Sequence, residues 1–152
     1  MMHKIIAHRG NLSGPEPVTE NTQAQVERCI KQGYRVEVDV WLQGGGLFLG
    51  HDAPVNPIPA YWLSDWSSYL FVHCKNIEAL LTLKGVCNCF GHDKDEFVVT
   101  TNGNLWVYPG KPLVPGAYAV LPETVSYTTE ELKLCSGICT DYPLRYQELL
   151  CC

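Results

Sequence analysis

The sequence predicts an α/β fold, a (β/α) barrel in which several crossover helices are missing. Strand and helix patterns alternate over roughly the first half of the chain, and several strand patterns then follow one another without helices between them. Length is the third observation, because a complete eight-unit barrel typically needs about 250 residues. With 152 residues the chain cannot hold eight full units, and we expect a single domain over residues 1–152.

The elements follow from local patterns. Strands are expected at residues 4–7, 34–41, 47–50, 70–74, 86–91, 97–100, 105–108, 117–121 and 137–140. Helices are expected at 20–32, 77–83 and 142–150. The first helix rests on the spacing of Ala24, Val26 and Ile30, and Gly33 ends it. Residues 101–104 (Thr-Asn-Gly-Asn) form a hairpin turn, so the strands on either side should be antiparallel.

Composition describes an ordinary globular protein. The chain is 46% hydrophobic and 18% charged, and its net charge of -5 comes without a basic block. Nonspecific nucleic-acid binding needs many Lys and Arg contacts with phosphates, so nucleic acid is excluded as a partner. The first apolar run reaches His8 and Arg9 too soon for a signal peptide, and no stretch is long enough to span a membrane. We therefore expect a cytoplasmic protein without an integral membrane segment.

Eight cysteines could suggest a secreted disulfide framework. Several of them lie inside strand-like apolar runs, however, and no export signal accompanies them, which indicates mostly buried thiols in a reducing compartment. Cys87-x-Cys89 and the terminal Cys151-Cys152 could also bind zinc or carry a lipid. The four-ligand zinc spacing and the four-residue prenylation box are both missing, which argues against these roles.

Polar residues at the ends of strand-like runs are the candidate functional residues. Four short signatures follow one another in the first third of the chain: His8-Arg9-Gly10, Glu20-Asn21-Thr22, Glu37-x-Asp39 and His51-Asp52. Barrel enzymes gather their catalytic groups at the carboxyl ends of the strands, which is where these residues fall. Glu37 and Asp39 are two residues apart and so share one face of their strand, as His73 and Lys75 do.

These residue types suit phosphodiester cleavage. The reaction needs proton transfer at the nucleophile and the leaving group, and positive charge near the phosphate oxygens. His8 and His51 could transfer protons near neutral pH. Glu37 and Asp39 could hold a divalent metal ion, and the valines around them indicate burial and hence a partner cation.

In these motifs the chain resembles the glycerophosphodiester phosphodiesterase family, within the wider group of phosphatidylinositol-specific phospholipase C and spider-venom sphingomyelinase D. Lys75 and the late segment 137–143 (Gly-Ile-Cys-Thr-Asp-Tyr-Pro) match as well. The resemblance implies a reduced TIM-type (β/α) barrel and a small-molecule phosphodiester substrate. It also implies the following roles: His8 and His51 as acid and base, Glu37 and Asp39 as metal ligands, Arg9 and Lys75 as phosphate contacts, and Glu20 as a supporting hydrogen-bond partner.

The chain departs from the family at two places. Only residues 53–69 separate the second histidine from the next barrel strand, where the family carries an inserted subdomain, so the site should be more open. The family has an acidic third metal ligand where this chain has His73, which is either the third metal ligand or a satisfied core histidine beside Cys74. An imidazole there favours Mn²⁺, Co²⁺, Ni²⁺ or Zn²⁺ over Ca²⁺ and suits Mg²⁺ only weakly. The cofactor expected is Mn²⁺ or Mg²⁺, with Zn²⁺, Co²⁺ or Ca²⁺ as alternatives.

Three classes of function stay open. The first is a metal-dependent phosphodiesterase acting on glycerophosphodiester-like substrates, by hydrolysis or by attack of a neighbouring hydroxyl to give a cyclic phosphate. The second is a degenerate barrel that binds a phosphorylated ligand without turnover. The third is a structural or interaction protein whose histidines are incidental.

Each of three further features has two possible interpretations. His92-Asp93 is either a solvated turn or a source of another ligand or substrate contact. The aromatic residues around 61–66 and 106–108 serve either core packing or a cage for a cation. Missing crossover helices could leave apolar barrel faces exposed, which a homodimer would cover.

Overall fold

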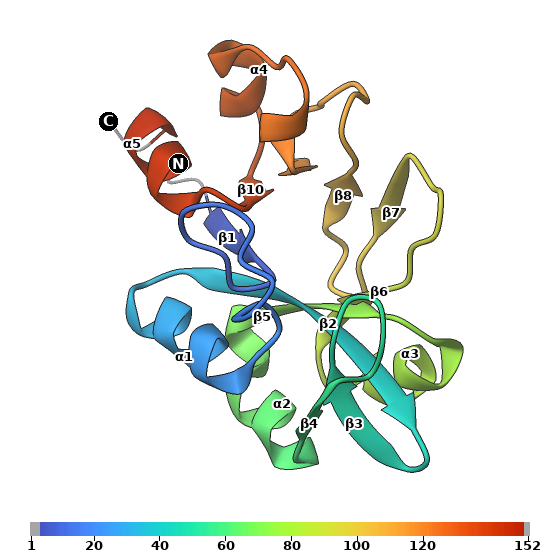
Figure 1. The fold of residues 1–152 in the computed structure, drawn as a ribbon. Coiled ribbons are helices and arrows are strands. Elements are labelled where there is room, and N and C mark those ends of the chain that lie inside the picture. The colour runs from blue at the N-terminus through green and yellow to red at the C-terminus, as the bar shows by residue number, and fades with distance from the viewer. Residues whose placement is uncertain (1–3, 151–152) are drawn as a thin grey trace.

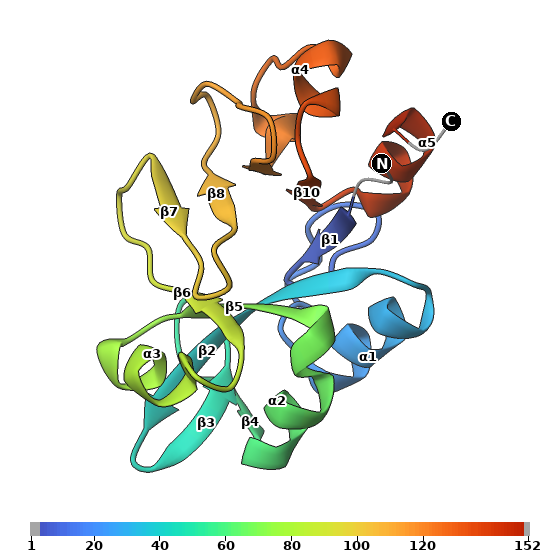
Figure 2. The same ribbon diagram turned by 180° about the vertical axis from the view of Figure 1, so that it is seen from behind.

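The computed structural model describes residues 4–150, which form a curled ten-stranded sheet with helices packed against it (Figures 1 and 2). The strands are β1 (Lys4–His8), β2 (Arg35–Gln43), β3 (Gly46–Leu49), β4 (Asn56–Ile58), β5 (Leu70–Cys74), β6 (Asn88–Phe90), β7 (Phe97–Val99), β8 (Leu105–Val107), β9 (Tyr118–Val120) and β10 (Gly137–Thr140). The α-helices are α1 (Gln23–Lys31), α2 (Ala60–Trp66), α3 (Ile77–Leu83), α4 (Thr129–Lys133) and α5 (Pro143–Leu150).

The strand order is that of a curled parallel sheet with antiparallel additions. Strands β6, β5, β2, β1, β10, β9 and β8 pair in that order, and every one of these pairs is parallel. Strand β7 joins β8 antiparallel, as the hairpin turn predicts, and β3 and β4 extend β2 antiparallel. Within the described chain, helices α1, α2, α3 and α4 connect parallel strands, but no α-helix lies between β6 and β8 or between β8 and β9. This arrangement is consistent with the predicted reduced barrel.

Local capping explains where several helices begin. Helix α1 starts at Gln23, later than the predicted residue 20, because the Thr22 side chain caps it by accepting from the backbone N–H of Gln25. Helix α3 matches its predicted range, and the Asn76 side chain caps it. Strand β4 and helices α2 and α4 were not predicted. Helix α4 carries a complete capping box between Thr128 and Glu131, a signature that its sequence shows.

The inside of the curled sheet is filled mainly by aromatic side chains. The inner cluster consists of Ile6, Phe71, Phe90, Trp106, Tyr118, Val120 and Cys139. Trp106 is only 1% exposed, and its ring centroid lies 5.2 Å from that of Phe71 and 5.2 Å from that of Phe90. Rings from β5, β6 and β8 therefore meet across the gap where β6 and β8 do not pair. Core packing is confirmed for Trp106.

The turn between β7 and β8 satisfies part of the free edge of β6. The backbone N–H of Thr101 donates to the Cys89 carbonyl at 2.9 Å, and the Thr101 hydroxyl accepts from the backbone N–H of Cys89 at 3.0 Å. The Asn88 amide donates to Asn104 at 2.8 Å. Hydrogen bonds from side chains and from the turn backbone thus replace regular strand pairing along the free edge of β6.

Six cysteines of the described chain are free and buried, as expected: Cys29, Cys74, Cys87, Cys89, Cys135 and Cys139. Cys151 and Cys152 lie outside the described residues. Between residues 4 and 150 no helix is both long and apolar enough to cross a membrane.

Strand β7 exposes apolar side chains on the part of the sheet that lacks crossover helices. Phe97 is 59% exposed and Val99 is 63% exposed. A second copy of the chain could cover them, and the homodimer stays a prediction.

We predict that Trp106→Ala lowers the free energy of unfolding by about 3–5 kcal/mol, because it removes the ring that joins β8 to β5 and β6. Urea denaturation measures the change. Tyr61→Ala is the matched control, since Tyr61 is 68% exposed and its loss should change stability by less than about 0.5 kcal/mol. Equal effects of the two substitutions would contradict the bridging role.

Candidate functional site

A cavity of about 190 Å³ opens where the parallel strands end. It is lined by His8, Arg9, Glu37, Asp39, His51, His73, Phe90, His92, Trp106, Tyr108, Val120 and Leu121. The first six of these are predicted site residues, and they come from four separate segments of the chain. Of the residues described, the predicted Lys75 and Glu20 are not part of this lining.

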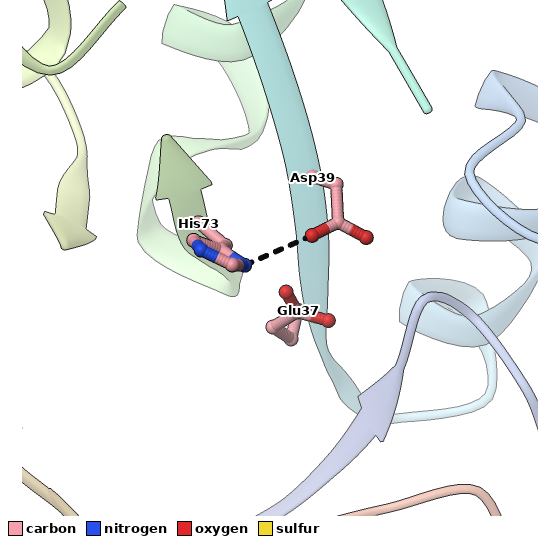
Figure 3. A group of neighbouring side chains, drawn as sticks. All are labelled: Glu37, Asp39 and His73. Carbon is pink, nitrogen blue, oxygen red and sulfur yellow. Dashed lines mark ion pairs between the residues drawn. The ribbon is translucent and has the colours of Figure 1, made fainter. Parts of the chain in front are cut away.

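Glu37, Asp39 and His73 form a compact buried group (Figure 3). Glu37 and Asp39 point to the same side of β2, and the pairing of β2 with β5 sets His73 opposite Asp39. His73 Nδ1 lies 3.0 Å from Asp39 Oδ1, and one ligand atom from each of the three residues lies within 4.8 Å of the others. Oxygen and imidazole donors at such spacing could hold a divalent metal ion.

Asp39 is held in its charged form. Its Oδ2 accepts from the Asn21 side-chain amide at 2.9 Å, and its backbone N–H donates to Asn21 Oδ1 at 3.0 Å. Burial by itself would raise the pKa of Asp39, but the His73 and Asn21 hydrogen bonds and the positive charges of His73 and Arg9 lower it to about 2. Asp39 is thus a carboxylate at any ordinary pH.

Glu37 is poorly compensated by comparison. It is 3% exposed, and burial raises its pKa, with the charge of Asp39 raising it further. Within the described chain it accepts a hydrogen bond from the Arg9 backbone N–H at 3.3 Å, and His8 Nε2 lies 3.7 Å away. A buried carboxylate with so little compensation suits an added cation, so the residues present fit a metal ion.

His8 is oriented by a partner from the far end of the chain. Its Nδ1 lies 2.8 Å from Asp141 Oδ1, which leaves Nε2 facing Glu37 and the cavity. Burial alone would lower the pKa of His8, but the hydrogen bond to Asp141 and the charges of Glu37 and Asp141 raise it. Asn11 donates to Asp141 at 2.8 Å and to Glu20 at 2.9 Å. The geometry therefore links Glu20 to the histidine.

Sequence reasoning assigned no role to Asp141, Asn11 or Asn21. Asp141 directly follows β10, so the rule that places functional groups after barrel strands could have identified it. Asn11 and Asn21 lie in loops, and only the folded structure shows which carboxylates they hydrogen-bond to.

His51 lies on the outer side of the cavity. Its Nδ1 is 2.8 Å from Asp52 Oδ1, and its side chain is 40% exposed. It follows Gly50, where a Cβ atom would collide with the Ala53 carbonyl oxygen, so the chain turns tightly at this point. A second cavity of about 410 Å³, formed mainly by segments 15–21 and 50–56, shares Arg9 and His51 with the first.

Backbone strain gathers around the site. Arg9, Asn21 and Leu121 have φ values of 54°, 52° and 46°, and they are the non-glycine residues of the described chain in the left-handed region. Arg9 and Leu121 line the first cavity, and Asn21 holds Asp39. Such conformations cost about 1–3 kcal/mol each and are typical of functional sites.

Other predicted residues are distributed around the rim. Arg9 Nη1 donates to Glu20 Oε2 at 3.4 Å, so Glu20 is placed to support the arginine. Lys75 follows β5, and its positive charge helps to lower the pKa of His92, after burial and the charge of His73. The His92 ring lines the cavity and stacks on Tyr108 at 3.6 Å, whereas Asp93 is exposed, so only the histidine of this pair reaches the site.

The fold and site together define a curled (β/α) sheet with a buried carboxylate and histidine group at its carboxyl end. No protein-family model and no curated protein matches the chain. Its fold is similar to the crystal structure of a "putative glycerophosphodiester phosphodiesterase" from Galdieria sulphuraria, with a TM-score of 0.61 and 13% sequence identity. The match covers 100% of this chain and 99% of that one. This likeness confirms the predicted resemblance at the level of the fold.

We predict that Glu37→Gln stabilises the metal-free protein at pH 7, because it removes a buried negative charge. The pKa of Glu37 is raised in the folded state, so the native protein binds this proton more tightly than the unfolded chain does. The free energy of unfolding therefore falls as the pH rises above the ordinary pKa of a glutamate. Urea denaturation in chelator measures the effect, with the exposed Glu148→Gln as control. With Mn²⁺ at about 100 times its Kd, the parent protein should gain about 2.7 kcal/mol and the variant less. A variant less stable than the parent in chelator would contradict the argument.

A second prediction concerns the protonation of Asp39 at low pH. The folded pKa of Asp39 is lowered to about 2 from its ordinary 3.8, so its stabilisation is fully present above pH 4 and disappears as the pH falls toward 2. The ¹³C carboxyl resonance of Asp39 in metal-free protein should reach its midpoint near pH 2. The carboxyl resonance of the exposed Asp65, recorded in the same spectra, is the internal control. A midpoint for Asp39 at or above pH 4 would be the contrary result.

Proposed function

We propose that this protein is a metal-dependent phosphodiesterase that cleaves small glycerophosphodiester-like substrates. The observation that carries the proposal is the convergence of His8, Arg9, Glu37, Asp39 and His73 with His51 on one cavity. Proton-transfer groups, a phosphate-binding cation and metal ligands lie together there, and a scaffold has no need for that combination. The fold similarity to a structure described as a phosphodiesterase supports the same reaction class.

His8 and His51 form the proposed acid and base pair. Each has its Nδ1 engaged by an aspartate, Asp141 for His8 and Asp52 for His51. A carboxylate at Nδ1 fixes the tautomer and leaves Nε2 for proton transfer. One histidine would take the proton of the attacking hydroxyl or water, and the other would protonate the leaving alkoxide.

The phosphate would sit beside Arg9, whose planar guanidinium can bind two phosphate oxygens. Arg9 and His51 belong to both cavities, so a phosphate at this point would direct one substituent into each. Lys75 would add positive charge from the rim. A substrate hydroxyl next to the ester would favour internal attack and a cyclic product.

Glu37, Asp39 and His73 would hold the metal ion. When bound, a divalent ion polarises the phosphoryl oxygens and lowers the pKa of a hydroxyl nucleophile. Two carboxylates and an imidazole suit Mn²⁺ and other transition metals, and Mg²⁺ less well. The protein's own contribution is to keep Asp39 charged and to bury Glu37 where an added cation is most favourable.

A phosphate-binding protein without turnover is the second candidate. It is favoured by His73, which stands where an acidic ligand is expected and leaves the site with one negative charge fewer. Only an activity measurement separates the two.

The test is ³¹P NMR of the protein with glycerophosphodiesters and an aryl phosphodiester, under Mn²⁺, Mg²⁺, Ca²⁺ or chelator. We expect turnover that is greatest with Mn²⁺ and absent in chelator, and a product shift that distinguishes a monoester from a cyclic phosphate. His8→Ala and His51→Ala should each lower kcat by about 10²- to 10⁴-fold, with Glu148→Gln as the unaffected control. No turnover with any metal, together with tight phosphate binding, would establish the second candidate instead.

A further inference from the structure

We propose that His92 is a fourth ligand of the metal ion, completing a site of two carboxylates and two imidazoles. The inference rests on the metal-dependent function proposed above. His92 lies in the stretch 86–123, to which the family resemblance assigns no roles, and its position and contacts in the folded chain point to ligation.

The position of His92 suits ligation. It follows β6, the strand next to β5 that carries His73, and both rings line the same cavity. The centroids of the His73 and His92 rings are 6.1 Å apart, with their planes at 52°. With metal–nitrogen bonds of about 2.1 Å, two imidazoles on one ion have ring centres roughly 5–6 Å apart. The group of ligand atoms that lie within 4.8 Å of one another does not include His92, so His92 would move toward His73 when the ion binds.

The surroundings of His92 resemble those of a metal-bound histidine. Its Nδ1 is buried, has no hydrogen-bond partner within the described chain, and lies 3.7 Å from Asp95 Oδ2. A ligating histidine typically donates its other ring N–H to a carboxylate. A slight closure onto Asp95 would make that bond at Nδ1 and leave Nε2 for the metal.

Aromatic stacking holds both imidazoles. His92 stacks on Tyr108 with ring centroids 3.6 Å apart and planes 13° apart, and His73 stacks on Phe90 at 5.1 Å and 8°. Stacking limits rotation of each ring, so fewer side-chain conformations are lost when an ion binds. This costs less free energy than ordering flexible ligands.

The donor set also changes which ion is preferred. Glu37, Asp39 and His73 alone offer few ligands, and a second imidazole adds a borderline-soft donor without adding charge. Two nitrogens and two carboxylates suit Mn²⁺, Co²⁺ or Zn²⁺, whereas Ca²⁺ prefers six to eight oxygens. His92 would therefore set metal selectivity as well as affinity.

The first experiment counts imidazoles on bound Mn²⁺ by pulsed EPR of protein labelled with ¹⁵N-histidine. We expect two imidazole nitrogens in the parent protein, one in His92→Ala, and two in His51→Ala. The last variant is the matched control, because it removes a cavity imidazole that is not proposed as a ligand.

The second experiment measures Mn²⁺ affinity by calorimetry. His92→Ala should weaken binding by on the order of 100-fold, and Asp95→Asn by about 10-fold. Asp93→Asn removes the same charge from the same turn, at a residue whose carboxylate does not pair with His92 Nδ1, and it should leave the affinity within about twofold.

The outcomes separate this inference from the proposed function. One imidazole in the parent protein, with Mn²⁺-dependent turnover, would overturn the role of His92 and leave the phosphodiesterase proposal standing. No Mn²⁺ binding at all would overturn both. If His92→Ala does not fold, the imidazole count of the parent protein and the affinity of His92→Gln decide the matter.

Discussion

Two carboxylates buried side by side on one strand determine much of the site's arrangement. Glu37 and Asp39 are 3% and 1% exposed, and a buried carboxylate is costly unless cations or hydrogen-bond donors surround it. His73 and Asn21 satisfy Asp39, whereas the contacts of Glu37 within residues 4–150 are a long hydrogen bond from Arg9 and the nearby His8 ring. Asp39 is thus a satisfied carboxylate, whereas Glu37 would be stabilised by an additional positive charge. This difference is the physical basis for proposing a metal ion at the site.

The strained backbone near the site follows from the need of these two buried carboxylates for hydrogen-bond donors. Asn21 adopts a left-handed conformation while its side chain makes two hydrogen bonds with Asp39. Arg9 is also left-handed, and its backbone N–H reaches Glu37. These local costs are offset because leaving either carboxylate without donors would cost more. The loops after β1 and before α1 are therefore shaped by what β2 buries.

A short chain can carry such a site because the missing crossover helices lie on another part of the sheet. Crossover helices are missing between β6 and β9, whereas the carboxylates and His8 lie on β1 and β2, whose connection retains helix α1. On the reduced side, Trp106 and its aromatic neighbours fill the interior, and the β7–β8 turn bonds to β6. The same side contributes His92 and Tyr108 to the cavity. This side of the sheet thus lacks crossover helices and still contributes residues to the cavity lining.

The sequence alone determined what depends on local periodicity. Alternation along 34–41 placed Glu37 and Asp39 on one buried face, and the hairpin turn at 101–104 predicted an antiparallel pair that the structure confirms. Only the tertiary structure decided the rest. Asp141 reaches His8 across 133 residues because β10 pairs with β1, and His92 lines the cavity whereas Lys75 does not. Such contacts depend on which distant strands pair and in which register, and the spacing within one segment does not specify its distant partner.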